Sequence, residues 1–401
     1  MKWLQNELNS ISHVCRNSRP SIGLERVYKV SGIINEVRHE LVNLRSICNT
    51  NLSSTIVKGE FLEGLKTILA KQTDHLQVKL KEEITERRRL HNQLVEMRGN
   101  VRVFCRIRPC DGASTIESFD DETLVLVNEE RVRRQFKLDH VFGPDTSNND
   151  VFRELSQLII SSMDGYNISI LAYGATNSGK TYTMEGIYER VGIEIFDARN
   201  TRHSWQYKFS VCVCEVYMEG VVDLLDLRNL NVDVRINPKT GMFYVPGLKR
   251  VEIDSPKRLA EIVASAKNVR SVSSTNCNEQ SSRSHLITCI GIDIVTPNGR
   301  HIESRIHLVD LAGSERLNKS GASGHVAKEG VAINKSLSAL GDVMNARANK
   351  SEHVPYRNST LTSVLQESLG GESKTLVIVQ LSPSMVRIQL LHALSIELGL
   401  I

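Results

Sequence analysis

Residues 174–181 read Gly-Ala-Thr-Asn-Ser-Gly-Lys-Thr, and this stretch decides the fold. It has the spacing G-x-x-x-x-G-K-[ST] of a phosphate-binding loop. Gly174 and Gly179 allow the backbone to curl, so that successive N–H groups point into one concavity and can hold phosphate oxygens. Lys180 is expected to bring a positive charge to the β- and γ-phosphates, and Thr181 to offer its hydroxyl to Mg²⁺. The sequence therefore predicts a nucleoside triphosphate site.

The flanks of the loop have the context that such a site needs. Residues 168–173 are apolar and predict a buried strand, and residues 182–185 can open a helix whose positive N-terminal end faces the phosphates. Beyond the loop, strands alternate with helices, which is typical of an α/β fold with a mostly parallel sheet covered on both faces. The expected elements include strands over 101–109 and 207–217, a helix over 149–163, and a hairpin from 232 to 253 that turns at 238–241.

Composition and charge limit the class of protein. A hydrophobic content of 40% and a charged content of 24% are ordinary for a soluble chain. No apolar run is long enough to span a bilayer, and residues 1–7 lack a signal-peptide core. The eight cysteines show no metal-ligand spacing, so reduced thiols are expected. Residues 1–98 hold 16 basic against 11 acidic side chains, which suits an acidic partner. We expect neither a membrane nor a nucleic acid as partner.

An extension precedes the predicted α/β domain. Residues 1–59 predict a helical or tail segment to which we assign no chemistry. Residues 60–98 contain no proline and predict one long amphipathic helix. Leucines follow a heptad there, but polar residues interrupt its core positions, so a two-stranded coiled coil and a single helix packed on the domain both stay open. Gly99 and Asn100 are typical of a helix end, which places the start of the domain at residue 99.

Two further stretches predict an enzyme whose loops sense the nucleotide. Residues 278–285 bring hydroxyls and Arg283 together, as expected of a loop that closes over Mg²⁺ and the γ-phosphate. Residues 306–309 predict an apolar strand that ends in Asp310, which places a carboxylate near Mg²⁺. Gly313 leaves room for its N–H group to approach the γ-phosphate. A polar loop and a helix-capping aspartate are the ordinary alternatives for each stretch alone, but the three motifs in this order favour the nucleotide site.

From Gly99 to about Pro383 the sequence resembles a kinesin motor domain. The resemblance is carried by six stretches: residues 106–109, 173–184, 278–285, 310–316, 333–341 and 353–359. Residues 86–92, running into 99–106, resemble the neck of C-terminal-motor kinesins, which carry the motor after the coiled coil and move toward microtubule minus ends. The resemblance implies an ATPase with the P-loop fold of that family, preceded by a long helical neck. It implies a location in the cytoplasm on the microtubule cytoskeleton and leaves a spindle location open.

The resemblance also implies a role for individual residues. The nucleotide would be held by Arg106, Arg108, Pro109, Gly174, Ala175, Thr176, Asn177, Ser178, Gly179, Lys180, Thr181, Tyr182 and Asn278. Magnesium would be held by Thr181, Ser282 and, through water, Asp310. The catalytic set would be Ser281, Arg283, Asp310, Gly313 and Glu315, with Arg283 and Glu315 pairing when the site closes and helping to position the attacking water.

A group of basic and aromatic residues is expected to contact microtubules. The family's contact elements fall on Arg235, Lys239, Lys319, Lys328, Lys335, Tyr356 and Arg357. Because the exposed surface of tubulin is acidic, these residues would bind it in a salt-sensitive way. Residues 60–98 would mediate a homo- or heterodimer. For any one lysine, solvated surface charge is the ordinary alternative.

The chain departs from the family at several positions. Ala175 and Asn177 stand where the family usually has glutamine and glycine or serine. Asparagine tolerates a left-handed backbone, so we expect the loop to form. The loop that normally follows residues 185–186 is very short here, and the last segment, 384–401, lacks the family's usual residues. Two alternatives to an active motor therefore stay open: a nucleotide-responsive microtubule binder or cross-linker with weak turnover, and a non-motile subunit of a heterodimer.

Overall fold

The computed structural model describes residues 100–383, apart from 111–114, 128–130, 203, 227, 229–231, 275–281, 316–324 and 371–372, together with part of 63–89. The chain divides into two units, residues 1–90 and 91–401. In the first unit, every described position between 63 and 89 is helical, with exposed ion pairs between Lys66 and Glu63 and between Arg89 and Glu86. The expected helix over 60–98 is thus present at each of these positions. The prediction for the segment 384–401 lies outside the described residues.

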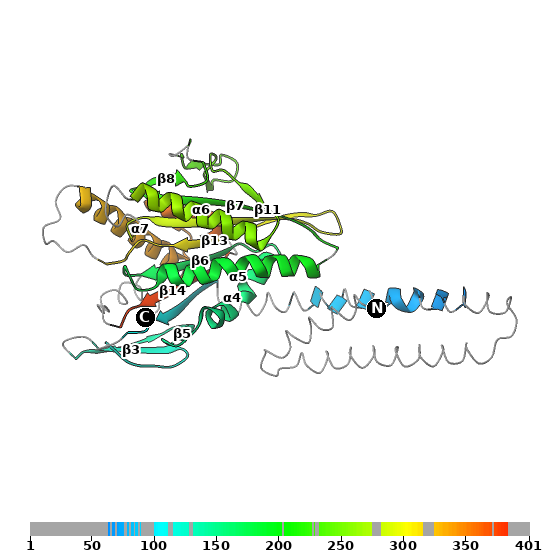
Figure 1. Cartoon of the computed structure of the whole chain (residues 1–401), viewed down its shortest axis with the longest axis horizontal. Helices are drawn as coiled ribbons and strands as arrows, with labels where there is room; N and C mark the ends of the chain where they lie inside the picture. The colour runs from blue at the N-terminus through cyan, green and yellow to red at the C-terminus, as the bar shows by residue number, and fades with distance from the viewer. Residues whose placement is uncertain are drawn as a thin grey trace. The chain divides into compact units, whose positions relative to one another are not determined.

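The second unit is built on a nine-stranded mixed sheet (Figure 1). Its strand order is β11-β7-β12-β13-β6-β14-β1-β5, with β8 paired to β7. The bounds are β1 Val101–Ile107, β5 His140–Phe142, β6 Ile168–Gly174, β7 Gln206–Tyr217, β8 Gly220–Asp223, β11 Val251–Ile253, β12 His285–Val295, β13 His301–Asp310 and β14 Lys374–Leu381. Strands β13, β6, β14, β1 and β5 run parallel, as predicted, whereas β7, β8, β11 and β12 pair antiparallel. The five residues between β12 and β13 are enough only for a hairpin, which forces that antiparallel pairing.

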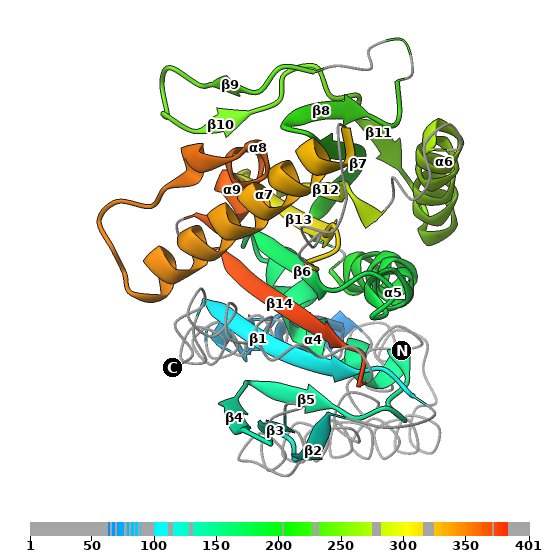
Figure 2. The same ribbon diagram turned by 90° about the vertical axis from the view of Figure 1, so that its left-hand side faces the viewer.

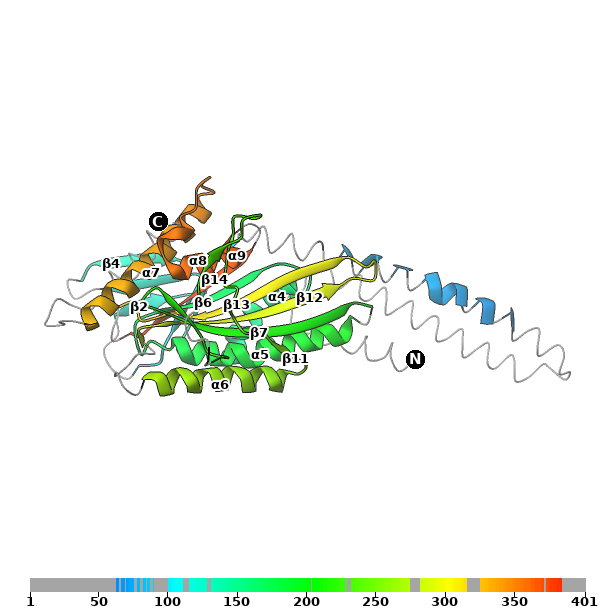
Figure 3. The same ribbon diagram turned by 90° about the horizontal axis from the view of Figure 1, so that it is seen from above.

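Helices cover both faces of this sheet, as Figures 2 and 3 show. One face carries α4 Asn148–Ser162, α5 Lys180–Thr201 and α6 Pro256–Ser274. The other carries α7 His325–Ala348, the 3₁₀ turn η2 Tyr356–Asn358, α8 Thr360–Val364 and α9 Gln366–Leu369. A small sheet of β2 Ile116–Phe119, β3 Thr123–Val127 and β4 Arg133–Lys137 lies beyond β5.

Strand β6 shows why the sequence folds in these layers. Every residue of the strand is buried, because both faces of the sheet are covered. Ile168, Ile170 and Ala172 face the core formed with α4, α5 and α6. Leu171 and Tyr173 face the second core, formed with α7, α8 and α9. The period-two alternation of a strand thus joins two hydrophobic cores through one apolar run.

The predicted hairpin is only partly right. Strands β9 Arg235–Ile236 and β10 Phe243–Tyr244 do pair around the turn at 238–241. The end of the predicted second arm leaves the hairpin, however, and becomes β11 on the edge of the main sheet beside β7. A turn at 246–247 explains the difference, because it interrupts the arm before Val251. Helix α5 runs without a break from Lys180 to Thr201, which agrees with the short connection expected after residue 186.

Among the residues that the structure describes, no helix is long and apolar enough to cross a membrane. The described cysteines are Cys105, Cys110, Cys212, Cys214 and Cys289, and all five are free thiols. The described part of the chain also holds no cluster of His, Cys, Asp or Glu suited to a metal ion.

Candidate nucleotide site and track face

The phosphate loop lies at the carboxyl end of β6, where the neighbouring parallel strands also end. Asp310 at the end of β13 pairs in register with Ala172, and Gln380 of β14 pairs with Gly174. This edge of an α/β sheet is where ligands bind in such folds. Helix α5 starts directly after the loop, and its N-cap, Gly179, has no side chain to occupy the first-turn N–H groups. Those groups are therefore free to receive a phosphate.

The loop backbone depends on three left-handed residues. Gly174 has a φ of 151°, Asn177 of 62° and Gly179 of 107°. A Cβ on Gly174 would lie 2.5 Å from the carbonyl oxygen of Gln380, so this position requires glycine. Asn177 adopts the left-handed conformation that the sequence predicted for it. The loop therefore forms with asparagine in place of the family's glycine or serine.

A pocket of about 510 Å³ opens beside the loop. Its lining consists of Arg106, Ile107, Arg108, Pro109, Pro144, Thr146, Asn177, Ser178, Gly179, Lys180, Thr181, Tyr182, Thr183 and Gln380. The guanidinium of Arg106 lies 5.2 Å from the centre of the Tyr182 ring. Arg106 also donates to Thr183 Oγ1 at 2.9 Å and to the carbonyl oxygen of Thr146 at 2.9 Å. These bonds fix one wall of the pocket, and the exposed Tyr182 ring provides a flat surface for a base.

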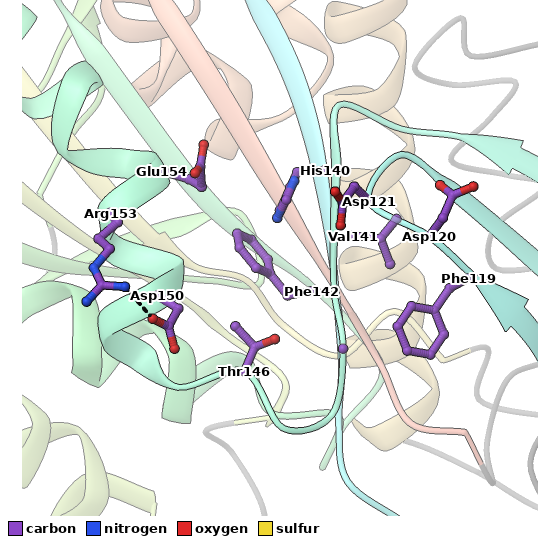
Figure 4. A pocket seen from close by; sticks show the side chains of 11 residues that line it. Phe119, Asp120, Asp121, His140, Val141, Phe142, Thr146, Asp150, Arg153 and Glu154 are labelled. Atoms are coloured by element: carbon purple, nitrogen blue, oxygen red, sulfur yellow. Dashed lines mark hydrogen bonds and ion pairs between the residues drawn. The ribbon is translucent and has the colours of Figure 1, made fainter. Parts of the chain in front are cut away.

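A second hollow, of about 440 Å³, adjoins the first and shares Thr146 with it. Figure 4 shows the carboxylates of Asp120, Asp121, Asp150 and Glu154 around its rim, with Arg153 paired to Asp150 at 2.9 Å. Four carboxylates against one arginine and His140 would repel a triphosphate. The chemistry of the lining therefore assigns the phosphates to the first pocket.

Lys180 is the buried cation of the first pocket. Its Nζ donates to the carbonyl oxygens of Gly174 at 2.9 Å and Ala175 at 2.8 Å. Burial lowers the pKa of Lys180, and the nearby carboxylates of Asp310 and Glu315 oppose that shift. The ammonium is thus held inside the loop by neutral oxygens, which phosphate oxygens can replace at a gain in charge complementarity.

Asp310 and Thr181 form a pair that fits a hydrated magnesium ion. Thr181 Oγ1 donates to Asp310 Oδ2 at 2.8 Å. The other carboxylate oxygen, Oδ1, is buried and has no hydrogen-bond partner. Burial raises the pKa of Asp310, and the bond from Thr181 opposes that rise. A buried, unsatisfied carboxylate oxygen is costly unless a cation or water completes it, and hard oxygen ligands suit Mg²⁺.

The two nucleotide-sensing loops already touch each other and the phosphate loop. Gly313 N donates to the carbonyl oxygen of Ser282 at 2.7 Å, and Ser314 N donates to that of Gly174 at 3.1 Å. Thr176 N donates to Glu315 Oε2 at 2.8 Å, and the Thr176 hydroxyl contacts Glu315 Oε1. A Cβ on Gly313 would lie 2.4 Å from both Glu315 Oε2 and Thr176 Oγ1, so a larger residue here would have to displace these side chains.

The predicted pair between Arg283 and Glu315 is not formed in this conformation. Glu315 binds Thr176, as described above, and Arg283 Nη1 donates instead to Glu329 Oε2 at 2.8 Å. Glu329 lies on α7, and its side chain is only 4% exposed. Tyr217 Oη donates to the other oxygen of this carboxylate at 2.5 Å. The desolvated Glu329 therefore holds the sensing arginine in a pair that does not include Glu315.

The structure brings most of the predicted nucleotide ligands together. Arg106, Arg108, Pro109 and residues 177–182 line the pocket. Thr176 contacts Glu315 rather than lining the pocket, and Gly174 and Ala175 supply carbonyl oxygens to Lys180. Asn278, Ser281 and Lys319 lie outside the described residues. Sequence reasoning missed Glu329 and Gln380, because a glutamate within a helix and a glutamine within a buried strand carry no motif.

The residues predicted to contact microtubules come from elements on one side of the sheet. Lys328 and Lys335 lie on α7, Tyr356 and Arg357 on η2, and Arg235 and Lys239 on the β9–β10 hairpin. Figure 2 shows this hairpin, α7 and α8 on the side opposite α5 and α6. Lys335 is within 3.8 Å of Glu219, and Arg235 within 3.6 Å of Asp233, but both basic side chains stay more than half exposed. We call these six residues the track face.

The family model of the kinesin motor domain matches residues 35–392. This chain belongs to the kinesin family. The kinesin-like protein KIN-14E of Oryza sativa subsp. japonica is 41% identical over 81% of this chain and 32% of that protein. KIN-14J of the same organism is 45% identical over 79% of this chain and 40% of that protein. Kinesin-like protein 2 of Schizosaccharomyces pombe is 37% identical over 95% of this chain and 52% of that protein. This kinesin chain thus spans about a third to a half of the length of these relatives.

Solved kinesin structures agree with the fold. The C-terminal motor and motor homology domain of Kar3Vik1, fused to a synthetic heterodimeric coiled coil, has a TM-score of 0.75 at 34% identity. That match covers 93% of this chain and 99% of the solved one. The motor domain of the kinesin-like protein Kar3 from Saccharomyces cerevisiae has a TM-score of 0.66 at 38% identity, over 75% of this chain and all of the other.

Proposed function

We propose that the chain is a microtubule-stimulated ATPase that uses Mg²⁺-ATP and moves toward microtubule minus ends. The observation that carries this function is the ion pair between Arg283 and Glu329. It ties the arginine of the nucleotide-sensing loop to the helix that presents Lys328 and Lys335. A change at the γ-phosphate that draws Arg283 away must therefore remove a contact of α7, which we call the track helix. Binding of a microtubule to this helix must in turn alter the nucleotide site.

The chain's own residues supply the positioning that phosphoryl transfer requires. The Arg106 and Tyr182 wall would take the base, and the N–H groups at the start of α5 would take the phosphates. Lys180 would exchange the carbonyl oxygens of Gly174 and Ala175 for phosphate oxygens. Mg²⁺, when bound, would neutralise phosphate charge, and Thr181, Ser282 and Asp310 are the residues that would hold it.

Closure would exchange the partners of the two sensing residues. Arg283 would leave Glu329 and Glu315 would leave Thr176, so that the two could pair and orient the attacking water. Such a pair is directional because a guanidinium binds a carboxylate in a fixed plane. Asn278 and Ser281 belong to this proposal by their place in the family motif, as does Gly313, whose N–H group would turn from Ser282 to the γ-phosphate.

The track face would bind the acidic surface of tubulin. Its lysines and arginines are exposed and come from three separate elements, so each contributes a screened, additive attraction. Lys319 would belong to the same group. Affinity would therefore fall as salt rises.

The family supports the direction, assembly and location that we propose. Minus-end motion is the expectation for C-terminal-motor kinesins, and KIN-14 proteins are among the relatives matched. We propose that residues 60–98 form the neck through which the chain dimerises, ahead of a motor domain over 99–401 and after an extension over 1–59. The chain would act in the cytoplasm on microtubules, spindle microtubules included.

The deciding experiment is ATP turnover by the purified chain, with and without polymerised tubulin, at low and moderate salt. Stimulation that fades as salt rises supports the motor. Nucleotide-dependent co-pelleting without turnover would instead support the alternative of a nucleotide-responsive binder. Glu315→Ala should bind nucleotide and lose turnover, whereas Glu303→Ala, at an exposed position of β13, should keep it. Unchanged turnover in Glu315→Ala would rule out its proposed role.

A heterodimeric assembly is favoured by one observation, the match to the Kar3Vik1 fusion over 93% of this chain. That solved protein is fused to a synthetic heterodimeric coiled coil. Sedimentation of the purified chain at micromolar concentration separates the cases, because a homodimer alone would argue against an obligate second subunit.

A further inference from the structure

A buried histidine joins the sensing loops to the track helix. His285 is the first residue of β12, two positions after Arg283, and only 3% of it is exposed. Ala312 N donates to its Nδ1 at 3.1 Å. On the other side of the ring, Nε2 lies 2.8 Å from Ser336 Oγ on α7. One side chain therefore bridges the segment after Asp310 and the helix that carries the track lysines.

The hydrogen bonds leave one arrangement of protons for this bridge. A backbone N–H can only donate, so Nδ1 of His285 accepts from Ala312 and Nε2 carries the ring proton. Nε2 then donates to Ser336 Oγ, whose own proton goes to the carbonyl oxygen of Ile333 at 2.8 Å. Burial, with Arg270 and Lys180 nearby, lowers the pKa of His285 to about 3, which keeps the ring neutral. Each hydrogen bond from Ala312 through His285 and Ser336 to Ile333 therefore has a defined donor and acceptor.

The backbone directly before His285 is held by a separate network of buried hydrogen bonds. Ser284, directly before it, is fully buried. Arg270 on α6 donates to both Ser284 Oγ and its carbonyl oxygen at 2.9 Å, and to Glu215 Oε1 at 3.0 Å. Both Arg270 and Glu215 have side chains less than a tenth exposed. The main chain at His285 is therefore anchored to α6 and β7, and a displacement of Ser336 acts on the ring rather than being absorbed by the strand.

We infer that His285 and Ser336 are positioning residues that transmit displacement between α7 and the backbone at Ala312. This inference rests on the proposed motor function and names the contact that couples its two ends. Ala312 precedes Gly313, whose N–H group now binds Ser282 and must turn to reach the γ-phosphate. A shift of α7 that moves Ser336 pulls on His285 and thereby on the peptide that sets Gly313. Neither residue lines the nucleotide pocket.

Three substitutions cut the bridge at different points. Ser336→Ala removes the helix end of it. His285→Asn leaves an oxygen able to accept from Ala312 but too short to reach Ser336. His285→Gln reaches Ser336 but leaves the Ala312 N–H group without its acceptor. Ser156→Ala is the matched control, because its hydroxyl makes one hydrogen bond of 3.0 Å to Glu194, between α4 and α5 and away from the sensing loops.

The measurement is the ratio of tubulin-stimulated to basal turnover in the full chain, with thermal unfolding recorded for each variant. Loss of one hydrogen bond from the coupling path should lower this ratio roughly 3- to 10-fold in Ser336→Ala. His285→Asn should lower it equally, and Ser336→Ala should have no further effect in that background. Ser156→Ala should keep the wild-type ratio. A wild-type ratio in Ser336→Ala, or independent effects in the double variant, would overturn the inference.

A second readout separates failure of this inference from failure of the proposed function. Hydrogen exchange of the α7 amides is compared with and without a non-hydrolysable ATP analogue, in the absence of tubulin. Ser336→Ala should abolish the response of α7 to the analogue that the wild type shows. Suppose that tubulin does not stimulate the wild type, that the ATP analogue still changes hydrogen exchange in its α7, and that this change is lost in Ser336→Ala. The proposed motor function is then wrong, whereas the inferred coupling through His285 and Ser336 is supported. An equal response in both proteins refutes the bridge.

Discussion

Replacing Glu329 by glutamine should raise basal ATP turnover. In the structure the carboxylate holds Arg283 at 2.8 Å, and only 4% of the Glu329 side chain is exposed. The proposed closed state needs the same guanidinium at Glu315. The two carboxylates therefore compete for one arginine, and the resting state is stabilised by whatever Glu329 contributes. Glutamine keeps the size of the side chain and an oxygen for Tyr217, but it removes the charge that holds Arg283.

The magnitude follows from the kind of contact. A hydrogen bond to a charged group contributes about 1.5–3 kcal/mol. Arg283 is 21% exposed, so water competes for it and the lower half of that range is appropriate. A loss of about 1.5–2 kcal/mol from the resting state corresponds to a basal rate roughly 10- to 30-fold higher. The stimulated rate should change little, so the ratio between the two should fall by the same factor.

The assay is steady-state phosphate release without tubulin, with thermal unfolding as the check on folding. Tyr217→Phe is the matched control, because it removes the bond to the other oxygen of Glu329 and leaves Arg283 in place. It should lower stability by about 1–3 kcal/mol, since the buried carboxylate then loses this hydrogen bond, without raising turnover. A Glu329→Gln protein that folds normally and has wild-type or lower basal turnover would refute the competition.

Three further predictions test other features of the chain. Asn177→Ala should lower nucleotide affinity by roughly 5- to 30-fold in equilibrium titration, because alanine at φ 62° costs about 1–2 kcal/mol, while Asn177→Gly should bind at least as well as the wild type. Burial lowers the pKa of His307 to about 3. Below about pH 6.5 the imidazole therefore binds a proton in the unfolded chain but not in the folded one, and the free energy of unfolding should fall as pH drops from 6.5 toward 3. His307→Gln should lessen this slope by up to about 1.4 kcal/mol per pH unit in denaturant titrations. Gly313→Ala should abolish turnover measured with tubulin while keeping the fold, because its Cβ would crowd Thr176 Oγ1 at 2.4 Å and hinder the turn of this peptide's N–H group toward the γ-phosphate.

The sequence predicted the parts of this molecule that obey local rules. A phosphate loop requires glycines and a lysine at fixed spacing, and an apolar strand ending in Asp310 requires only period-two burial, so both could be recognised without a structure. The hairpin after residue 232 was predicted only in part, since the pairing of β11 with β7 depends on residues far away in the chain. The partner of Arg283 could not be predicted either, because the choice between Glu315 and Glu329 is made by tertiary packing.

The same limit explains why the coupling contacts escaped sequence reasoning, although they follow a regular spacing. Glu329 and Ser336 are seven residues apart on α7, which is close to two helical turns, so both lie on the face toward the sensing loops, about 10 Å apart along the axis. Lys328 and Lys335 precede them by one residue each and are turned about 100° away. The helix is thus held at two points on one face and offers its charge on another. Because two attachment points resist rotation of the helix as well as sliding, a pull on the lysines has to reach Arg283 and His285 together.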